Sequence, residues 1–262
     1  MTRRIDLNCD MGEAFGAWKM GDDLAMLDVV TSANIACGFH AGDPSVMLAT
    51  VTAAVKRGVT IGAHPGFADL QGFGRRRIVG LSSSELEALI AYQTGALMGI
   101  AAMVGAHVTY VKAHGALGNM ACEDATIAAA LASAIRAVDR GLVFVVMPGT
   151  ELERAGQRLG LPMAREIFAD RAYNDDLTLV SRSHPGAVLH DPRLIAARAV
   201  KMINESVIVT ASGKSIPARA DTICVHGDTP SAVDVARSLR TAFEADGIKV
   251  TAFASPSPTE PA

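Results

Sequence analysis

Residues 4–13, Arg-Ile-Asp-Leu-Asn-Cys-Asp-Met-Gly-Glu, form the stretch that best indicates the fold of this 262-residue chain. Polar and apolar side chains alternate, which predicts a β-strand with Asp6, Asn8 and Asp10 on one face. The strand then runs into a polar turn that ends at Glu13. A short strand that ends in reactive groups is typical of parallel α/β folds, which bind ligands at the carboxyl ends of their strands.

The same pattern recurs along almost the whole chain, because short β-branched or apolar runs alternate with helical patterns. We predict strands at residues 4–9, 33–37, 59–63, 108–113, 142–147, 164–168, 222–225 and 248–253. Asp43, Asp191 and Thr229 each precede a proline, and Ser82 precedes Glu85 by three residues, so each marks a helix start. These units favour an α/β barrel of seven or eight parallel strands over two domains, although an open doubly wound sheet would give a similar pattern.

The organisation predicts one domain. No strong Pro/Ser/Gly linker separates the units, so residues 1–254 are predicted to form a single (β/α) barrel. Residues 207–217, with Ala-Ser-Gly-Lys at their centre, are predicted to form a hairpin insertion. Residues 255–262 are rich in proline and serine and are predicted to be a flexible tail.

Composition indicates a cytoplasmic protein with a small ligand. The net charge of -3 gives no electrostatic reason to expect nucleic acid or a membrane surface as a partner. Four scattered cysteines without a Cys-x-x-Cys pair indicate buried thiols, and the start is too polar for a secretory signal. Residues 88–111 lack charged side chains, but Gln93, Thr94 and several glycines favour a buried helix followed by a strand over a membrane span.

Candidate catalytic groups follow the predicted strands. Paired carboxylates can share acid and base roles, histidines beside glycines can contact a ligand closely, and a strand lysine needs an anion if it is buried. Any single one of these residues could instead be a helix cap, half of an ion pair or a structural histidine. The candidate catalytic residues are Asp10, Glu13, His40, His64, Lys112 and His114.

Other polar residues are candidates for binding a substrate or a phosphate. The loop Gly72-Phe-Gly-Arg-Arg-Arg77 offers guanidinium groups that can bind a carboxylate or a phosphate, and the chain contains no Walker P-loop motif. Asp and His residues at several strand ends are also metal-ligand types, but no tight ligand spacing is present, so a metal stays an open question. The candidate binding residues are Asn8, Arg75, Arg76, Asp170, Arg171, His226 and Asp228.

Several long motifs occur in the same order as in a known family and cover nearly the whole chain. Residues 6–13, 34–43, 62–67, 72–76, 111–117, 166–171 and 225–228 resemble those of the LamB/YcsF lactam-utilisation family. The resemblance implies an irregular (β/α) barrel similar to those of glycoside hydrolases and polysaccharide deacetylases. It also implies the A subunit of an ATP-dependent 5-oxoprolinase, which converts 5-oxo-L-proline to L-glutamate with ATP and Mg²⁺ and works with separate subunits B and C. The resemblance is also compatible with a homo-oligomer of this chain.

The implied activity suggests a mechanistic hypothesis in which ATP phosphorylates the amide oxygen of the lactam. Water, deprotonated by Asp10, Glu13 or His40, attacks the ring carbon. Lys112 and Arg75 or Arg76 then hold the phosphate or the substrate carboxylate. The candidate proton donors to the ring nitrogen are His64, His114 and His226.

Two departures from the family and two rival functions qualify this expectation. The family pattern Lys-Pro-His-Gly-Ala-Leu-Tyr-Asn is changed at Ala113 and Gly118, which affects the loop after the fourth strand. One rival function is a metal-dependent deacetylase or amidohydrolase on a similar barrel, which needs no ATP. The other is a non-catalytic subunit that only binds the lactam.

Overall fold

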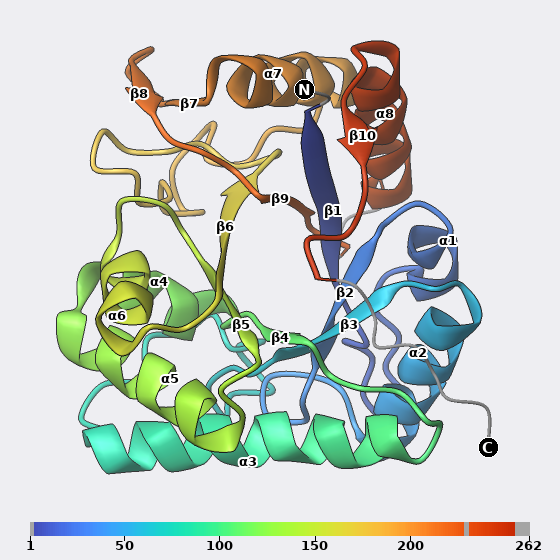
Figure 1. The fold of residues 1–262 in the computed structure, drawn as a ribbon, viewed down its shortest axis with the longest axis vertical. Coiled ribbons are helices and arrows are strands. Elements are labelled where there is room, and N and C mark those ends of the chain that lie inside the picture. The colour runs from blue at the N-terminus through green and yellow to red at the C-terminus, as the bar shows by residue number, and fades with distance from the viewer. Residues whose placement is uncertain (1–2, 228–230, 255–262) are drawn as a thin grey trace.

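Seven parallel strands close into a barrel that helices surround (Figure 1). The structure is a computed structural model, and it describes residues 3–227 and 231–254. The strands pair in the order β1-β2-β3-β4-β5-β6-β9, and β9 pairs in turn with β1, which closes the ring. The ring consists of β1 (Arg4–Met11), β2 (Ser32–Ala36), β3 (Thr60–His64), β4 (Tyr110–Val111), β5 (Val143–Val146), β6 (Met163–Phe168) and β9 (Thr222–Val225). The predicted fold class is therefore confirmed.

In the described part of the chain, three further strands lie outside this ring. β10 (Lys249–Val250) pairs only with Arg4 and Ile5 of β1, so the last predicted strand extends the sheet beside the ring and does not close it. β7 (Val207–Val209) and β8 (Ser215–Pro217) form an antiparallel hairpin between the last two barrel strands.

The helices begin where capping residues satisfy their first backbone N–H groups. Asp43 and Asp191 cap helices that open with proline, and Ser82 and Glu85 form a capping box. The predicted start at Thr229 lies outside the described residues. The helices are α1 (Asp23–Leu27), α2 (Pro44–Lys56), α3 (Ser83–Ala102), α4 (Gly115–Glu123), α5 (Ala125–Val138), α6 (Glu151–Leu159), α7 (Pro192–Glu205) and α8 (Ala232–Ala245).

The uncharged stretch 88–111 is divided between α3 and β4. The helix ends at Ala102 and the strand begins at Tyr110, as the glycine and polar interruptions predicted. Among the described residues, no helix combines the length and the apolarity that a membrane crossing requires.

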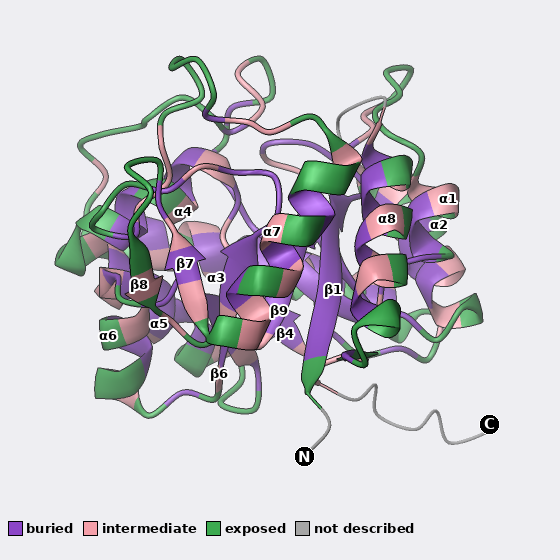
Figure 2. Ribbon diagram, turned by 90° about the horizontal axis from the view of Figure 1, so that it is seen from above, coloured by how far each residue is buried: buried purple, intermediate pink, exposed green. Residues whose placement is uncertain are grey.

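The barrel strands are buried on both faces, but the two faces differ in chemistry. Figure 2 shows β1 buried along most of its length, while the helices expose their outer faces. Ile5, Leu7 and Met11 of β1 belong to the apolar core between the barrel and the helices. Asp6, Asn8 and Asp10 alternate with them and are also buried, so they line the barrel interior. The barrel interior is therefore polar, and its polar side chains lead toward the carboxyl ends of the strands.

Candidate functional site

The lower part of the barrel interior is a closed network of hydrogen bonds around Asp6. Its carboxylate accepts hydrogen bonds from the hydroxyl groups of Thr31 at 2.7 Å, Ser32 at 2.6 Å and Thr222. Burial raises the pKa of Asp6 to about 6, even though these hydrogen bonds act in the opposite direction. The three donors come from outside β1 and hold its neighbours in register.

Asn8 connects this network to the groups above it. Its Nδ2 donates to Thr222 Oγ1 at 2.6 Å and to Glu166 Oε1 at 3.1 Å, while its Oδ1 accepts from Asn34 Nδ2 at 2.7 Å. Asn34 Nδ2 also donates to Asp10 Oδ1 at 2.8 Å. Asn8 is thus fully engaged with protein groups and supports the residues that face the ligand.

Lys112 lies at the centre of the site, between two carboxylates. Its Nζ is 2.8 Å from Asp10 Oδ1, 2.9 Å from Glu166 Oε1 and 3.0 Å from Cys224 Sγ. Burial alone would lower the pKa of Lys112, but Asp10, Cys224 and Glu166 raise it well above its usual value. Burial alone would likewise raise the pKa of Asp10, but His64 and Lys112 hold it well below its usual range. Lysine and aspartate are therefore both ionised at neutral pH.

Three histidines and Glu13 form a second cluster beside this ion pair. His114 Nδ1 is 3.0 Å from His64 Nε2 and 3.7 Å from Glu13 Oε1, and His40 Nε2 is 3.4 Å from the same oxygen. The rings of His40 and His114 stack with centroids 3.7 Å apart. Burial, together with the neighbouring imidazoles, lowers the pKa of His40 and of His114 well below the usual value. His40 and His114 are therefore neutral at physiological pH.

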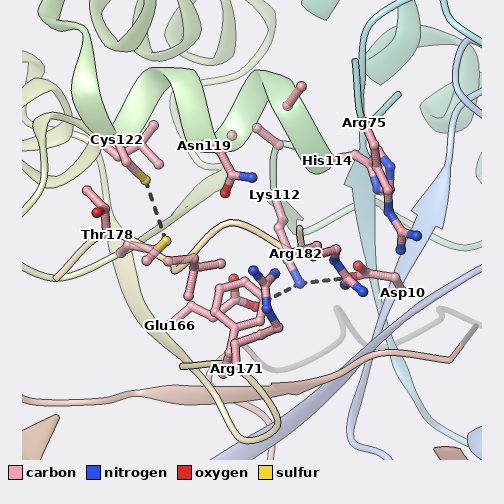
Figure 3. Close-up of a pocket in the computed structure, with 18 of the residues that line it drawn as sticks. Asp10, Arg75, Lys112, His114, Asn119, Cys122, Glu166, Arg171, Thr178 and Arg182 are labelled. Carbon is pink, nitrogen blue, oxygen red and sulfur yellow. Dashed lines mark hydrogen bonds and ion pairs between the residues drawn. The ribbon is translucent and has the colours of Figure 1, made fainter. Parts of the chain in front are cut away.

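A cavity of about 390 Å³ opens next to both clusters. Figure 3 shows Lys112 with Asp10, Glu166, Arg171 and Arg182 around it, and α4 along one side. The loop after β6 forms another part of the lining with residues 178–182. The guanidinium groups of Arg75, Arg171 and Arg182 line the cavity together with Lys112, so its lining can bind an anion. Its volume lies at the lower end of the range for small-molecule sites, roughly 300–1,000 Å³.

The structure brings the six candidate catalytic residues together, but it separates the binding candidates. Arg75 lines the cavity, whereas the exposed Arg76 forms an ion pair with Asp69. Arg171 also lines the cavity, and it donates to the carbonyl oxygens of Val180 at 2.7 Å and Ala187 at 3.3 Å. Arg171 therefore shapes the loop that covers one side of the site.

His226 follows β9, and its Nδ1 lies 2.9 Å from Asp170 Oδ2. Burial opposes ionisation of Asp170, but the neighbouring His226 lowers its pKa below the usual value. His226 lines the cavity, and Asp170 orients its ring. Asp228 lies outside the described residues.

Sequence reasoning left three contributing side chains out of the candidate site. Glu166, Asn34 and Cys224 all contact Lys112 or Asp10. A signal for two of them was present, because Glu166 and Asn34 are polar residues within predicted strands. Such a residue must face a partner inside the barrel, which the strand alternation could have indicated.

The two departures from the family pattern lie next to each other on the cavity wall. Ala113 and Gly118 both line the cavity, in the loop before α4 and in its first turn. A Cβ atom at Gly118 would lie 2.8 Å from the carbonyl oxygen of Ala113, which is too close for an unshifted backbone. A side chain at position 118, in the first turn of α4, would therefore require the backbone at Ala113 to shift.

Fold and site together define a parallel β/α-barrel protein with its polar groups gathered at the carboxyl ends of the strands. Residues 5–257 match the LamB/YcsF family, and the chain belongs to this family.

Two comparisons support this assignment, and a third shows a shared fold. A protein of Nitrobacter hamburgensis that is named as the A subunit of 5-oxoprolinase is 62% identical over 249 residues, which are 95% of this chain and 98% of that protein. The lactam utilization protein of Thermus thermophilus is 44% identical with a TM-score of 0.90, over 95% of this chain and 100% of that structure. A family 4 carbohydrate esterase of Streptomyces lividans shares the fold with a TM-score of 0.52 at 11% identity, over 99% and 98% of the two chains.

Proposed function

We propose that this chain is the A subunit of an ATP-dependent 5-oxoprolinase, which opens 5-oxo-L-proline with water to give L-glutamate. Family membership and relatives of that name, 62% identical in one case, support the proposal. Among the structural features, it depends most on Lys112, a buried and ionised lysine held between Asp10 and Glu166 next to a small cavity. A buried cation at this place can stabilise negative charge on an amide oxygen.

The proposed substrate carries a carboxylate, and the cavity carries cations that fit it. Arg75, Arg171 and Arg182 line the cavity, and guanidinium groups bind carboxylates through paired hydrogen bonds. ATP, with Mg²⁺, supplies the phosphoryl group that makes the lactam carbon electrophilic. The same arginines are the residues of this chain that fit such a phosphate.

We assign the attacking water to the cluster of Glu13, His64 and His114. Two of these residues, His64 and His114, line the cavity. The pKa of His114 is lowered by burial, and its Nε2 faces the carbonyl oxygen of Phe73, so its Nδ1 is the nitrogen without a hydrogen at neutral pH. A neutral imidazole can accept a proton from water. Asp10 is the weaker candidate base, because His64 and Lys112 lower its pKa well below the usual range. In this scheme Asp10 positions Lys112, and His40 positions Glu13.

The proposed complex contains two further subunits, B and C, and operates in the cytoplasm. We propose that phosphorylation requires those partners, because the chain has no P-loop motif. A homo-oligomer of this chain is compatible with the proposal.

The test is glutamate and phosphate release from 5-oxo-L-proline and ATP, by the purified chain alone and with the B and C subunits. We expect glutamate only when the partners and ATP are all present. Activity without ATP that requires a metal would instead support an amidohydrolase. No glutamate in any combination, with normal lactam binding, would support a purely binding role.

A further inference from the structure

The hydrogen atoms on His64 and His114 are placed by backbone carbonyl groups. His64 Nδ1 is 2.8 Å from the carbonyl oxygen of Lys112, and His114 Nε2 is 2.8 Å from that of Phe73. A carbonyl oxygen only accepts hydrogen bonds, so each of these nitrogens carries the ring hydrogen. The other nitrogen of each ring, Nε2 of His64 and Nδ1 of His114, is therefore the one that can bind a metal ion.

These two nitrogens face each other, with carboxylate oxygens of Asp10 and Glu13 near them. His64 Nε2 is 3.0 Å from His114 Nδ1 and 3.2 Å from Asp10 Oδ2, while Glu13 Oε1 is 3.7 Å from His114 Nδ1. The four side chains that carry these atoms are buried, and each atom is of a type that binds a metal ion. Buried polar atoms at such distances are held together by a shared proton or by a cation between them.

We propose that Glu13, His64 and His114 bind a divalent transition-metal ion of the zinc type. Zinc binds histidine nitrogen and carboxylate oxygen at about 2.0–2.2 Å in a tetrahedron, so its ligand atoms lie roughly 3.3–3.5 Å apart. Two of the three separations, 3.0 Å and 3.7 Å, lie on either side of this value, and all three are below 4.8 Å. Hydrogen bonds from the outer ring nitrogens to backbone carbonyls are the usual support of metal-binding histidines.

His40 belongs to the same group but has a different role. Glu13, His40, His64 and His114 offer ligand atoms that all lie within 4.8 Å of one another. However, the rings of His40 and His114 are parallel, at 3° and 3.7 Å, so their in-plane lone pairs cannot both be directed at one ion. His40 Nε2 instead lies 3.4 Å from Glu13 Oε1 and donates to it, which orients the carboxylate.

The three ligands leave a fourth position for a water molecule or a substrate. His64 and His114 line the cavity, so an ion bound to them is accessible from it. Three protein ligands and one open position are typical of catalytic zinc, which lowers the pKa of bound water to about 7. With the ion bound, it replaces His114 as the group that activates water. The metal site itself does not depend on the substrate or on ATP.

Metal binding is measured directly, on protein that carries no histidine tag. The metal content of the purified protein is determined, the protein is stripped with a chelator, and Zn²⁺ and Co²⁺ are titrated by calorimetry and visible absorption. We expect one ion per chain and the intense absorption bands of four-coordinate Co²⁺. His64→Ala and His114→Ala should each weaken binding at least about 100-fold, and His40→Phe about 10-fold or more.

Two variants make the outcome decisive. His107→Ala removes an exposed histidine and should bind metal like the wild type. Glu13→Gln keeps the shape of the site but removes its negative charge, so it tests the site even if the alanine variants do not fold. Absence of stoichiometric uptake, or unchanged affinity in the folded variants, would overturn the proposal. NMR of the imidazole nitrogens would then be expected to show His64 and His114 sharing a proton.

Discussion

Single residues in this site are held in one protonation state by the charged groups that contact them. Lys112 is ionised although it is buried, because Asp10 and Glu166 lie within 3 Å of its Nζ. Such a buried ion pair contributes little net stability, but removing one member is costly because a buried charge is left without its partner. Lys112 and its two carboxylates therefore act as a unit in folding as well as in binding.

Lys112→Met should lower both activity and stability. The variant leaves Asp10 and Glu166 facing each other without a cation, so we expect the free energy of unfolding to fall by about 3–5 kcal/mol. Glutamate formation with the partner subunits should fall at least about 100-fold. Urea denaturation and the coupled assay measure the two effects.

Two comparisons test the cause of this loss. Adding Glu166→Gln to Lys112→Met should recover part of the stability but none of the activity. Lys214→Met breaks an exposed pair with Asp175 and should leave the stability almost unchanged, because solvent screens such a pair. Equal effects at Lys112 and Lys214 would contradict our account of the buried pair.

The raised pKa of Asp6 predicts that the stability of the folded protein depends on pH. Its pKa is raised from 3.8 to about 6 in the folded protein, so the folded state binds the proton more tightly than the unfolded state. The contribution of Asp6 to stability is therefore greatest below about pH 4 and is lost as the pH rises to about 6 and above. The change corresponds to about 3 kcal/mol.

The measurement compares the wild type with Asp6→Asn between pH 4 and 7. The difference in unfolding free energy between the two proteins should change with pH in the stated direction. A constant difference between wild type and Asp6→Asn would show that Asp6 keeps an ordinary pKa.

At the scale of elements, two helix-capping residues that look alike in the sequence differ in the contacts they make. Asp43 and Asp191 both precede a proline, and each accepts two hydrogen bonds from the first turn of its helix. Asp43 also accepts a hydrogen bond from the backbone N–H of Gly16 at 2.8 Å. It therefore fixes the loop after β1, which carries Glu13.

Asp43→Ala should cost more than Asp191→Ala. We expect about 1 kcal/mol for the loss of a cap at Asp191 and about 2 kcal/mol at Asp43. Hydrogen exchange at Gly16 should become faster in Asp43→Ala and stay unchanged in Asp191→Ala. Equal exchange in the two variants would mean that the loop after β1 is held by other contacts.

Elements also show how far the sequence could predict this protein. Strand periodicity and capping signals predicted the parallel barrel and the starts of α2, α3 and α7, because both follow from local patterns. The loop after β6 could not be predicted, since its shape depends on Arg171 binding carbonyl groups 9 and 16 residues away. The tautomers of His64 and His114 also depend on distant carbonyl groups.

At the scale of the whole molecule, barrel closure joins residues that are far apart in the chain. Lys112 contacts Cys224, and Asn8 donates a hydrogen bond to Thr222, because β9 pairs with both β1 and β6. Any change that forces neighbouring strands apart should therefore weaken the site as well as the fold.

One such point is the place where Tyr110 crosses a neighbouring strand. In the strand register Tyr110 of β4 lies beside Gly62 of β3, which in turn lies beside Asn34 of β2. The tyrosine ring passes over Gly62, and its hydroxyl donates to Asn34 Oδ1 at 2.7 Å. A Cβ atom at Gly62 would lie 2.0 Å from this ring, so only glycine leaves it enough room.

Gly62→Ala should therefore destabilise the whole barrel, because the buried ring must move and Asn34 then loses a donor. We expect a loss of about 3 kcal/mol or more in unfolding free energy, and weaker lactam binding through the contact of Asn34 with Asp10. Gly95→Ala is the matched control, since its exposed position in α3 has no atom within 4 Å of the added methyl group. That variant should instead gain about 0.5–1 kcal/mol, because alanine favours a helix over glycine. If both variants lost stability equally, the crossing of Tyr110 over β3 would not be what constrains this barrel.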